Sequence, residues 1–177
     1  LYSCLLGVIQ SNNIFLCIDE KLPIEKKKKI LNSCNPDLIL NCSSIDELPF
    51  SISIPVVSKV ELKTILNREK GDFSTIKLPD ENLATYIFFT SGTTGNPKPI
   101  LGKHKSLAHF INWQKTEFNI TKGNRVAQIT SLSFDVMLRE CLLPLLSGGT
   151  LVLPETSITD YKFMTSWIND KKIDIIH

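Results

Sequence analysis

YIFFTSGTTGNPKPI, residues 86–100, is the stretch of this chain that decides how the rest is interpreted. An apolar run typical of a buried strand breaks here into two glycines, four hydroxyl residues and a lysine. A loop of that composition can hold phosphate, and it can also be an ordinary surface turn. The chemistry of the loop and the sequence on either side of it are needed to choose between these two interpretations.

Segment 90–98 (TSGTTGNPK) supplies every group that a phosphate-binding loop needs. Such loops present free backbone N–H groups, little side-chain bulk, hydroxyl donors and one long cation. Gly92 and Gly95 allow the backbone to approach a ligand closely, and Lys98 can reach a phosphate oxygen. The hydroxyl donors are Thr90, Ser91, Thr93 and Thr94. We expect the loop to follow a buried strand, at the edge where ligands of open α/β sheets bind.

Two common nucleotide-binding patterns are absent from this segment. A Walker A loop requires Gly-Lys-Ser/Thr after four spacer residues, but counting from Gly92 the second glycine falls on Pro97, and Pro99 follows the lysine. The dinucleotide fingerprint G-x-G-x-x-G is also missing. Composition alone therefore leaves phosphate binding and a generic turn open.

The overall composition is typical of a globular intracellular protein. The 177 residues are 42% hydrophobic, and the net charge of +2 is too small to indicate nucleic acid or an acidic membrane surface. Five irregularly spaced cysteines without a C-x-x-C pair favour reduced core thiols and give metal binding little support. Because no signal peptide or membrane-spanning run is found, we expect a cytoplasmic protein. The chain lacks an initial methionine and both ends look cut, so we expect an internal fragment.

Short apolar runs alternate with helical stretches, which predicts an α/β fold with a largely parallel sheet. The predicted strands are 14–18, 38–40, 55–57, 86–89, 99–101, 125–129, 150–153 and 173–176. The predicted helices are 24–34, 60–67, 104–117, 134–146 and 160–170. Residues 68–82 are polar and aperiodic, and they are the best candidate for an internal subdomain boundary.

The helix over 134–146 has the clearest predicted buried face. Residues at i, i+3 and i+4 spacing form it: Phe134, Met137, Leu138, Cys141, Leu142 and Leu145. Ser133 is the expected N-cap and Gly148-Gly149 the expected end. Pro144 is expected to kink the helix or to shorten its regular part.

Two further helical segments carry notable side chains. In 160–170 a similar stripe is formed by Phe163, Met164, Trp167 and Ile168, and core packing is the interpretation for this stripe too. The lysine run 26–29 invites a phosphate interpretation. Four consecutive residues spread around a helix, however, so a solvated face is expected.

The longer match YIFFTSGTTGNPKPI closely resembles the signature loop of the adenylate-forming superfamily, unbroken from Thr90 through Lys98. That superfamily includes acyl-CoA synthetases, luciferases and the adenylation domains of nonribosomal peptide synthetases. The stretches GVIQSNNIFLCID, HKSLAHF and LSGGTLVLPE fall in the family's order and spacing. The resemblance implies that residues 1–177 are a partial AMP-binding domain, an incomplete part of the large N-terminal subdomain of such an enzyme. It further implies that segment 90–98 binds ATP and pyrophosphate, and that His104 opens a helix beside the nucleotide.

SLSFDVMLRE, residues 131–140, resembles the Phe-Asp-x-Ser-x-x-Glu stretch of peptide-synthetase adenylation domains. There the aspartate pairs with the α-ammonium of the amino acid, and Asp135 occupies that position. An acceptor that stays ionised at neutral pH is what a buried ammonium needs. The alternative is that Asp135 complements the dipole at the start of a helix, an effect of about 0.3–1 kcal/mol that needs no ligand.

The same resemblance implies that Phe134, Val136 and Arg139 line the substrate pocket. A cationic lining at Arg139 would favour an acidic or polar substrate side chain, unless Arg139 turns outward to solvent. Met137 stands where the family has a serine, which we interpret as a packing difference. Pro99 replaces the usual glycine of the loop and removes one N–H donor.

The reaction implied by the resemblance is attack of a carboxylate on the α-phosphate of ATP, with Mg²⁺ sharing the phosphate charge. A phosphopantetheine thiol on a carrier protein then takes the aminoacyl group, so a peptidyl carrier protein and neighbouring synthetase domains are the expected partners. An acyl-CoA or aryl-acid ligase and a non-catalytic nucleotide-binding remnant are the alternatives. The family's adenine-binding segment, its ribose-binding acidic residue and its catalytic lysine are absent up to His177. We therefore expect no catalytic residue and no metal ligand in this chain, and no adenylation by the chain alone.

Overall fold

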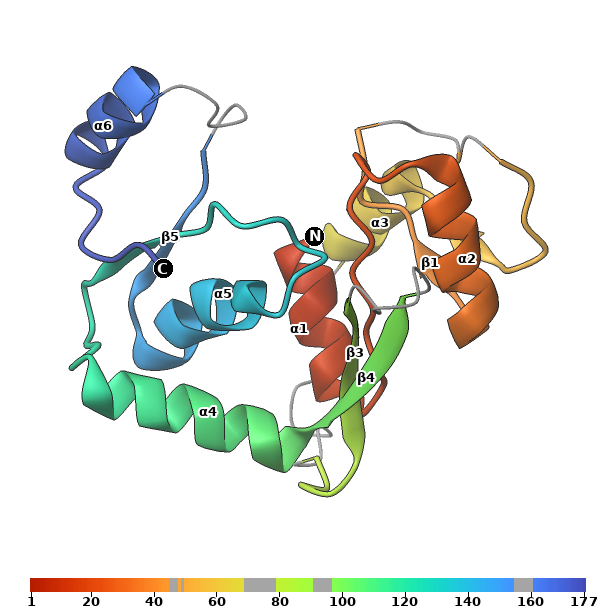
Figure 1. The fold of residues 1–177 in the computed structure, drawn as a ribbon, viewed down its shortest axis with the longest axis horizontal. Coiled ribbons are helices and arrows are strands. Elements are labelled where there is room, and N and C mark those ends of the chain that lie inside the picture. Colours follow the sequence, from red (N-terminus) through yellow and green to blue (C-terminus); the bar gives the residue numbers. More distant parts are fainter. Residues whose placement is uncertain (45–47, 49, 69–78, 91–96, 155–160) are drawn as a thin grey trace. The chain divides into compact units, whose positions relative to one another are not determined.

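The computed structural model describes residues 1–44, 48, 50–68, 79–90, 97–154 and 161–177. The chain divides into two compact units, Leu1–Leu101 and Gly102–His177, here unit 1 and unit 2. Short strands alternate with helices in both (Figure 1), which confirms the predicted α/β class. Much of the predicted boundary 68–82 lies outside the described residues, so that boundary stays a prediction.

Unit 1 begins with helices and ends with the two strands beside the signature loop. In order it contains α1 (Tyr2–Gln10), α2 (Ile24–Cys34), β1 (Ile39–Leu40), β2 (Val56–Val57), α3 (Lys59–Leu66), β3 (Ala84–Thr90) and the first residues of β4 (Lys98–Lys103). β1 pairs with β2 in parallel, and β3 pairs with β4. α3 starts with a capping box in which Ser58 Oγ accepts from the Glu61 N–H and the Glu61 carboxylate accepts from the Ser58 N–H.

The predicted strand 14–18 is reduced to one parallel bridge between Phe15 and Tyr86. The Phe15 N–H donates to the Thr85 carbonyl (3.0 Å), and the Ile87 N–H donates to the Phe15 carbonyl (2.9 Å). The Phe15 ring is buried and lies 6.2 Å from the Tyr86 ring and 6.4 Å from the Phe88 ring. These contacts hold β3 from one side and so position the end of the strand, where the loop begins.

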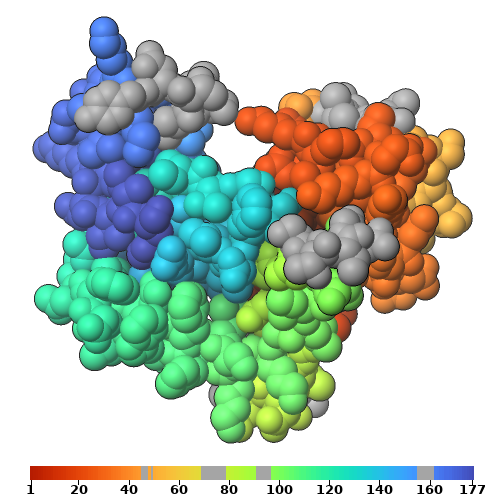
Figure 2. Space-filling view, in the orientation of Figure 1, coloured from red at the N-terminus to blue at the C-terminus, as the bar shows by residue number. Residues whose placement is uncertain are grey.

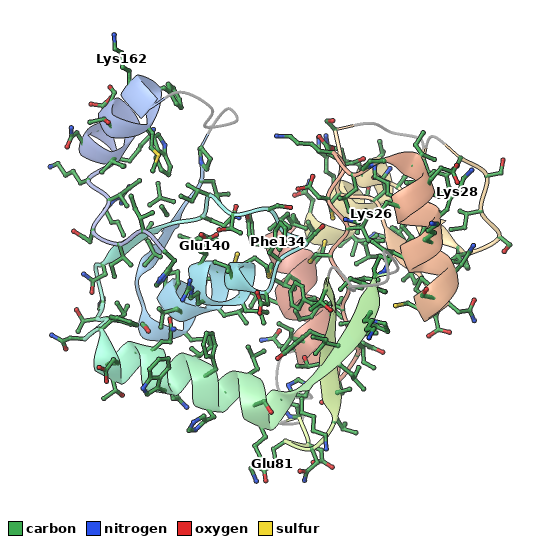
Figure 3. All side chains as sticks on the ribbon, viewed as in Figure 1. Lys26, Lys28, Glu81, Phe134, Glu140 and Lys162 are labelled. Atoms are coloured by element: carbon green, nitrogen blue, oxygen red, sulfur yellow. The ribbon has the colours of Figure 1, made fainter. Side chains whose placement is uncertain are left out.

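The lysine run on α2 is not the uniformly solvated face that we predicted. Lys27 is buried, and its Nζ donates to the Glu20 carbonyl at 2.6 Å. Lys26 and Lys28 extend from α2 (Figure 3), and Lys28 pairs with Glu25 at 3.3 Å. The prediction fails at Lys27 because a long side chain can lie along apolar surface and still reach a backbone acceptor.

Unit 2 is built around parallel strand contacts. Its elements are α4 (His104–Glu117), β5 (Arg125–Ala127), α5 (Val136–Ser147), β6 (Thr150–Val152) and α6 (Tyr161–Asp170). β5 pairs in parallel with β6, and the predicted strand 173–176 is reduced to one parallel bridge between Val126 and Ile175. The Ala127 N–H donates to the Ile175 carbonyl (2.9 Å). β5 therefore lies between β6 and the C-terminal segment, and both contacts are parallel.

The buried face of α5 differs from the predicted stripe. Met137, Leu138, Cys141 and Leu142 are buried as expected. Phe134 is 60% exposed and Leu145 is 37% exposed, while residues outside the stripe, among them Leu143 and Glu140, are buried instead. The predicted stripe was wrong at Phe134 because that residue precedes the helix. It missed Leu143 and Glu140 because α5 contacts α4 as well as β5 and β6, so that more than one side of the helix is buried.

Both ends of α5 are defined by local chemistry. The N-cap is Asp135 and not Ser133, and Pro144 does not end the helix, which continues to Ser147. Gly148 has φ +74°, the left-handed conformation predicted for the helix end. A Cβ on Gly149 would lie 2.7 Å from the Asn124 carbonyl oxygen, so only glycine fits where α5 turns into β6.

The last helix contributes one large side chain to the core. Trp167 is buried with Ala127 and Val152, and Ile168 packs against this cluster, whereas Phe163 is 41% exposed. The predicted α6 stripe is therefore right for Trp167 and wrong for Phe163. Within the described ranges, no helix has the length and apolar character needed to cross a membrane.

Candidate functional site

The signature loop joins the end of β3 to the start of β4, as its sequence predicted. Thr90 is the last residue of β3 and Lys98 the first of β4, and both are exposed. Thr90 Oγ1 donates to the Lys98 carbonyl at 3.5 Å, a weak contact between the two strand ends. The loop residues Ser91, Gly92, Thr93, Thr94 and Gly95 lie outside the described residues, so their roles remain predictions.

A hollow of about 380 Å³ lies in unit 1 at the base of this loop. It is lined by Lys29, Ile30, Asn32, Ser33, Phe89 and Pro97. Phe89 precedes Thr90 and Pro97 precedes Lys98, so the hollow borders both stems of the loop. Its size lies within the range of small-molecule sites. The sequence analysis did not single out Lys29; the signal was its i, i+3, i+4 spacing with Asn32 and Ser33, which puts all three on one face of α2.

Pro99 lies in a strand that has one partner among the described strands. It is the second residue of β4 and is exposed. Among the described strands, β4 pairs with β3 alone. A strand with one partner can accept proline on its unpaired side, because the missing N–H is not needed for the ladder. The substitution is therefore compatible with the strand.

His104 is the first residue of α4, as expected. It is 8% exposed, and its Nε2 has no hydrogen-bond partner among the described residues. A buried imidazole nitrogen without a partner suits a residue that meets a ligand, but its place beside a nucleotide remains a prediction.

Asp135 occupies the N-cap position of α5 (φ −62°, ψ −23°) and is exposed. Its side chain makes no capping hydrogen bond to the helix. Phe134 projects beside it at the start of α5 (Figure 3), and Val136 is half-buried. The carboxylate is therefore accessible to a positively charged ligand and does not serve as a hydrogen-bonding cap.

Arg139 lies one helical turn after Asp135 and is half-buried. Its Nε is shielded from solvent and has no hydrogen-bond partner in the described part of the chain, and its place in the substrate pocket stays a prediction. His177 lies near Arg139: burial lowers the pKa of His177, and the Arg139 charge lowers it further. The sequence analysis missed His177; the signal was its position directly after a predicted strand, at the carboxyl edge of the sheet.

Glu140 ends the stretch 131–140, but the sequence analysis gave it no role. It is fully buried in α5 (Figure 3), and its carboxylate accepts from Thr130 Oγ1 (2.7 Å) and from the Thr130 N–H (3.1 Å). Gln128 Nε2 lies 3.5 Å from the same carboxylate and donates to the Thr130 carbonyl. Glu140 thus orders the segment that leaves β5. The signal was a carboxylate between Leu138 and Cys141, inside the apolar face.

The cysteines are free thiols, but the prediction that they lie in the core is right only for Cys141, because the other four are half-buried. Burial raises the pKa of Cys17 to about 11, and the neighbouring Cys42 adds a smaller increase. Among the described residues, no group of three or more His, Cys, Asp or Glu side chains is placed to hold a metal ion.

Comparison with known proteins places these features in a family. A sequence profile described as AMP-binding enzyme matches residues 1–177. The D-alanine–D-alanyl carrier protein ligase of Listeria monocytogenes is 32% identical over 163 residues, which cover 87% of this chain and 30% of the ligase. Gramicidin S synthase 1 of Brevibacillus brevis is 27% identical over 177 residues, which cover 99% of this chain and 16% of the synthase. The chain thus spans less than a third of either relative.

A solved structure has the same fold. The N-terminal subdomain of Klebsiella oxytoca NpsA, in complex with 3-hydroxybenzoyl-AMSN, matches with a TM-score of 0.83 at 18% identity. The match covers 99% of this chain and 43% of that chain. The predicted N-terminal subdomain fold is therefore confirmed.

Proposed function

The chain belongs to the AMP-binding enzyme family, and from this premise we propose that its protein activates an amino acid as an aminoacyl-adenylate for nonribosomal peptide synthesis. One observation carries the proposal: the exposed carboxylate of Asp135 at the start of α5, which caps no helix N–H. An α-ammonium needs such an acceptor, whereas fatty and aryl acids carry no ammonium. The names of the two curated relatives support it, since one is a D-alanine–D-alanyl carrier protein ligase and the other is gramicidin S synthase 1.

In the proposed reaction a carboxylate oxygen of the amino acid attacks the α-phosphorus of ATP. A bond forms between that oxygen and phosphorus, the bond from phosphorus to the bridging oxygen breaks, and pyrophosphate leaves. We assign segment 90–98 to the β- and γ-phosphates, with Lys98 as the cation and Thr90 as a hydroxyl donor at the loop ends. Mg²⁺ enters with ATP as part of the substrate, and no described residue is assigned to it.

The activated amino acid is proposed to pass to a carrier protein. The sulfur of a phosphopantetheine thiol attacks the acyl carbon, a thioester forms and AMP leaves, while the thiol proton goes to solvent. The name of the Listeria ligase includes a carrier protein, which supports this partner. Because this chain spans under a third of that ligase, the carrier contacts are assigned to the whole protein.

ATP–pyrophosphate exchange by the whole protein tests the proposal. We expect at least one α-amino acid to support exchange, and Asp135→Ala to lose about 2–5 kcal/mol of transition-state stabilisation, read as kcat/KM. Asp170→Asn is the matched control, because it removes an exposed carboxylate of unit 2 from α6 and should leave exchange unchanged.

The alternatives predict different outcomes of the same assay. Exchange with fatty or aryl acids and with no amino acid would identify an acyl-CoA or aryl-acid ligase. No exchange with any acid would identify a non-catalytic nucleotide-binding remnant. Activity of Asp135→Ala within about threefold of the unchanged protein would remove the ammonium role of Asp135.

A further inference from the structure

Two half-buried thiols of unit 1 lie in contact with each other. The sulfur of Cys42 is 4.0 Å from the sulfur of Cys4, and this contact joins residues that are 38 positions apart in the chain. Cys4 lies in the first turn of α1, and Cys42 comes two residues after β1 ends. Two thiols in contact can be oxidised to a disulfide without unfolding the chain, provided that the segments carrying them are held in place.

The backbone on both sides of Cys42 is held by hydrogen bonds. On one side the N–H of the buried Asn41 donates to the Val57 carbonyl (2.9 Å). On the other side the Ser44 N–H donates to the Glu20 carboxylate (2.9 Å). The Cys42 side chain therefore starts from a fixed segment, and its sulfur stays within reach of α1.

The segment that carries Cys4 is held as well. Its neighbour Leu5 is buried, and the Leu5 N–H donates to the Leu1 carbonyl (2.9 Å) in the first turn of α1. Figure 2 shows the red and orange residues of unit 1 packed into one continuous surface. To bond, the two sulfurs must move from 4.0 Å to about 2 Å apart. Changes of side-chain rotamer can supply this movement, so the backbone does not have to shift.

The contact has a direction, which separates the roles of the two thiols. The Cys42 S–H donates to the Cys4 sulfur. Burial raises the pKa of Cys42, and Cys4 raises it further. Because the thiolate is the nucleophile, a thiol that keeps its proton is not the first to react. We therefore assign the first attack to Cys4 and the second step to Cys42.

Other chemistry at this place has less support. Burial raises the pKa of Cys17, and Cys42 adds a smaller increase, so this nearby third thiol also keeps its proton. In the described part of unit 1, no three side chains of the kinds that bind metals are arranged around an ion. Oxidation of the pair is the reaction that two thiols in contact favour.

We propose that Cys4 and Cys42 form a modification site, which a peroxide converts to a disulfide that joins α1 to the segment after β1. The Cys4 thiolate attacks one peroxide oxygen: a sulfur–oxygen bond forms, the oxygen–oxygen bond breaks and hydroxide leaves, so Cys4 becomes a sulfenic acid. The Cys42 sulfur then attacks the Cys4 sulfur, and the departing hydroxide leaves as water with the Cys42 proton. The two sulfurs lose two electrons and the peroxide gains them. This site is separate from the proposed adenylation reaction.

Peptide mass spectrometry of the whole protein tests the pair. The folded protein is treated with hydrogen peroxide, its remaining thiols are blocked with iodoacetamide, and it is digested without reductant. We expect a linked pair of peptides that contain Cys4 and Cys42, lighter by two hydrogen atoms than the free peptides together. Dithiothreitol should separate them. Linkage of Cys42 to Cys17, or oxidation without any link between Cys4 and Cys42, would overturn the inference.

Substitutions separate the two roles. Cys42→Ser is expected to abolish the linked peptides and to leave Cys4 as a sulfenic acid that dimedone traps. Cys4→Ser is expected to abolish both products. Cys34→Ser is the matched control, because it alters another half-buried thiol of unit 1, at the end of α2, and should not change the yield. Trapping of Cys42 instead of Cys4 would overturn the assigned order.

The unfolded protein shows whether the fold directs the reaction. In concentrated urea, peroxide should give a mixture of cysteine pairs, because the contact between α1 and the segment after β1 is lost. The same mixture from the folded protein would overturn the inference.

Hydrogen exchange measures the effect of the bond on α1. A disulfide between residues 38 positions apart restricts the unfolded chain and opposes the opening of α1. In the oxidised whole protein, the Leu5 amide should exchange at least about tenfold more slowly, and dithiothreitol should restore the original rate. Equal or faster exchange after oxidation would show that the two sulfurs are not placed to bond in the folded chain.

Discussion

Glu140 illustrates how one buried carboxylate can order a neighbouring segment. Its oxygens accept from both the side chain and the backbone of Thr130, shortly after β5. The charge is expensive to bury, but two hydrogen bonds at 2.7 and 3.1 Å offset that cost. Without them the Thr130 N–H would lose its described partner. The segment between β5 and α5 therefore depends on a residue ten positions further along the chain.

Glu140→Gln is expected to lower the free energy of unfolding by about 1–3 kcal/mol. The amide keeps one acceptor but presents an NH₂ group where the Thr130 donors point. Urea-induced unfolding followed by tryptophan fluorescence measures the change. Glu117→Gln, at the exposed end of α4, should change stability by less than about 0.5 kcal/mol. Equal stabilities of the two variants would contradict the role of Glu140.

The raised pKa of Cys17 predicts a loss of stability at alkaline pH. The folded thiol has a pKa of about 11 against a reference value of 9.0, so above about pH 9 the unfolded chain loses its proton first. The contribution of Cys17 is present below pH 9 and is lost as the pH rises to about 11, by about 2–3 kcal/mol. The stability difference between the unchanged protein and Cys17→Ala, measured by urea unfolding from pH 8 to 11, should shrink accordingly. If the stability difference between the two proteins stays constant from pH 8 to 11, the pKa of Cys17 is not raised by burial.

At the scale of the element, two glycines and two backbone hydrogen bonds constrain the turn from α5 to β6. Gly148 adopts a left-handed backbone conformation. Gly149 lies so close to the Asn124 carbonyl oxygen that a Cβ on Gly149 would be 2.7 Å from it. The Gly149 N–H donates to the Pro144 carbonyl (2.8 Å), and the Thr150 N–H donates to the Asn124 carbonyl (2.8 Å). These bonds align β6 beside β5.

Gly149→Ala is expected to destabilise the protein by about 1–3 kcal/mol, because the new methyl would overlap a backbone oxygen that is held in place. Gly7→Ala is the matched control: it lies inside α1 with nothing within 4 Å of the place that its new methyl would take, so it should stabilise by about 0.5–1 kcal/mol. Thermal unfolding of both variants checks the opposite signs. If Gly149→Ala leaves the unfolding temperature unchanged, the backbone of the turn can move to make room for the methyl group.

For the whole molecule, local stability should follow the depth of the strands. In unit 2 the Ala127 amide is fully buried and donates to Ile175. In unit 1 the amide of Ile39 in β1 donates to Pro55 from a half-buried, two-residue strand. Deep, well-packed amides exchange through larger openings than shallow ones.

Hydrogen exchange measured residue by residue tests that difference. The amides of Val126, Ala127 and Gln128 should exchange at least about tenfold more slowly than that of Ile39, after correction for intrinsic rates. Equal protection would indicate that both units open together.

Much of the fold followed from local patterns. The bounds predicted for α2 and α4 match the structure, and Gly148 ends α5 as expected. The predictions failed where a tertiary contact decides the outcome. Strands 14–18 and 173–176 became single bridges, and the buried face of α5 shifted from Leu145 towards Leu143.

The sequence by itself determined the family and most of the order of strands and helices, because these depend on residues close together in the chain. Helix α1 was not among the predicted helices, and the phosphate chemistry of the 90–98 loop stays a prediction. The tertiary structure alone decided that Glu140 orders Thr130 and that the charge of Arg139 lowers the pKa of His177. Those pairs arise when α5 packs against β5 and the C-terminal segment adds its bridge. Residues as far apart in the chain as Arg139 and His177 can influence each other only through such packing, and no local pattern records it.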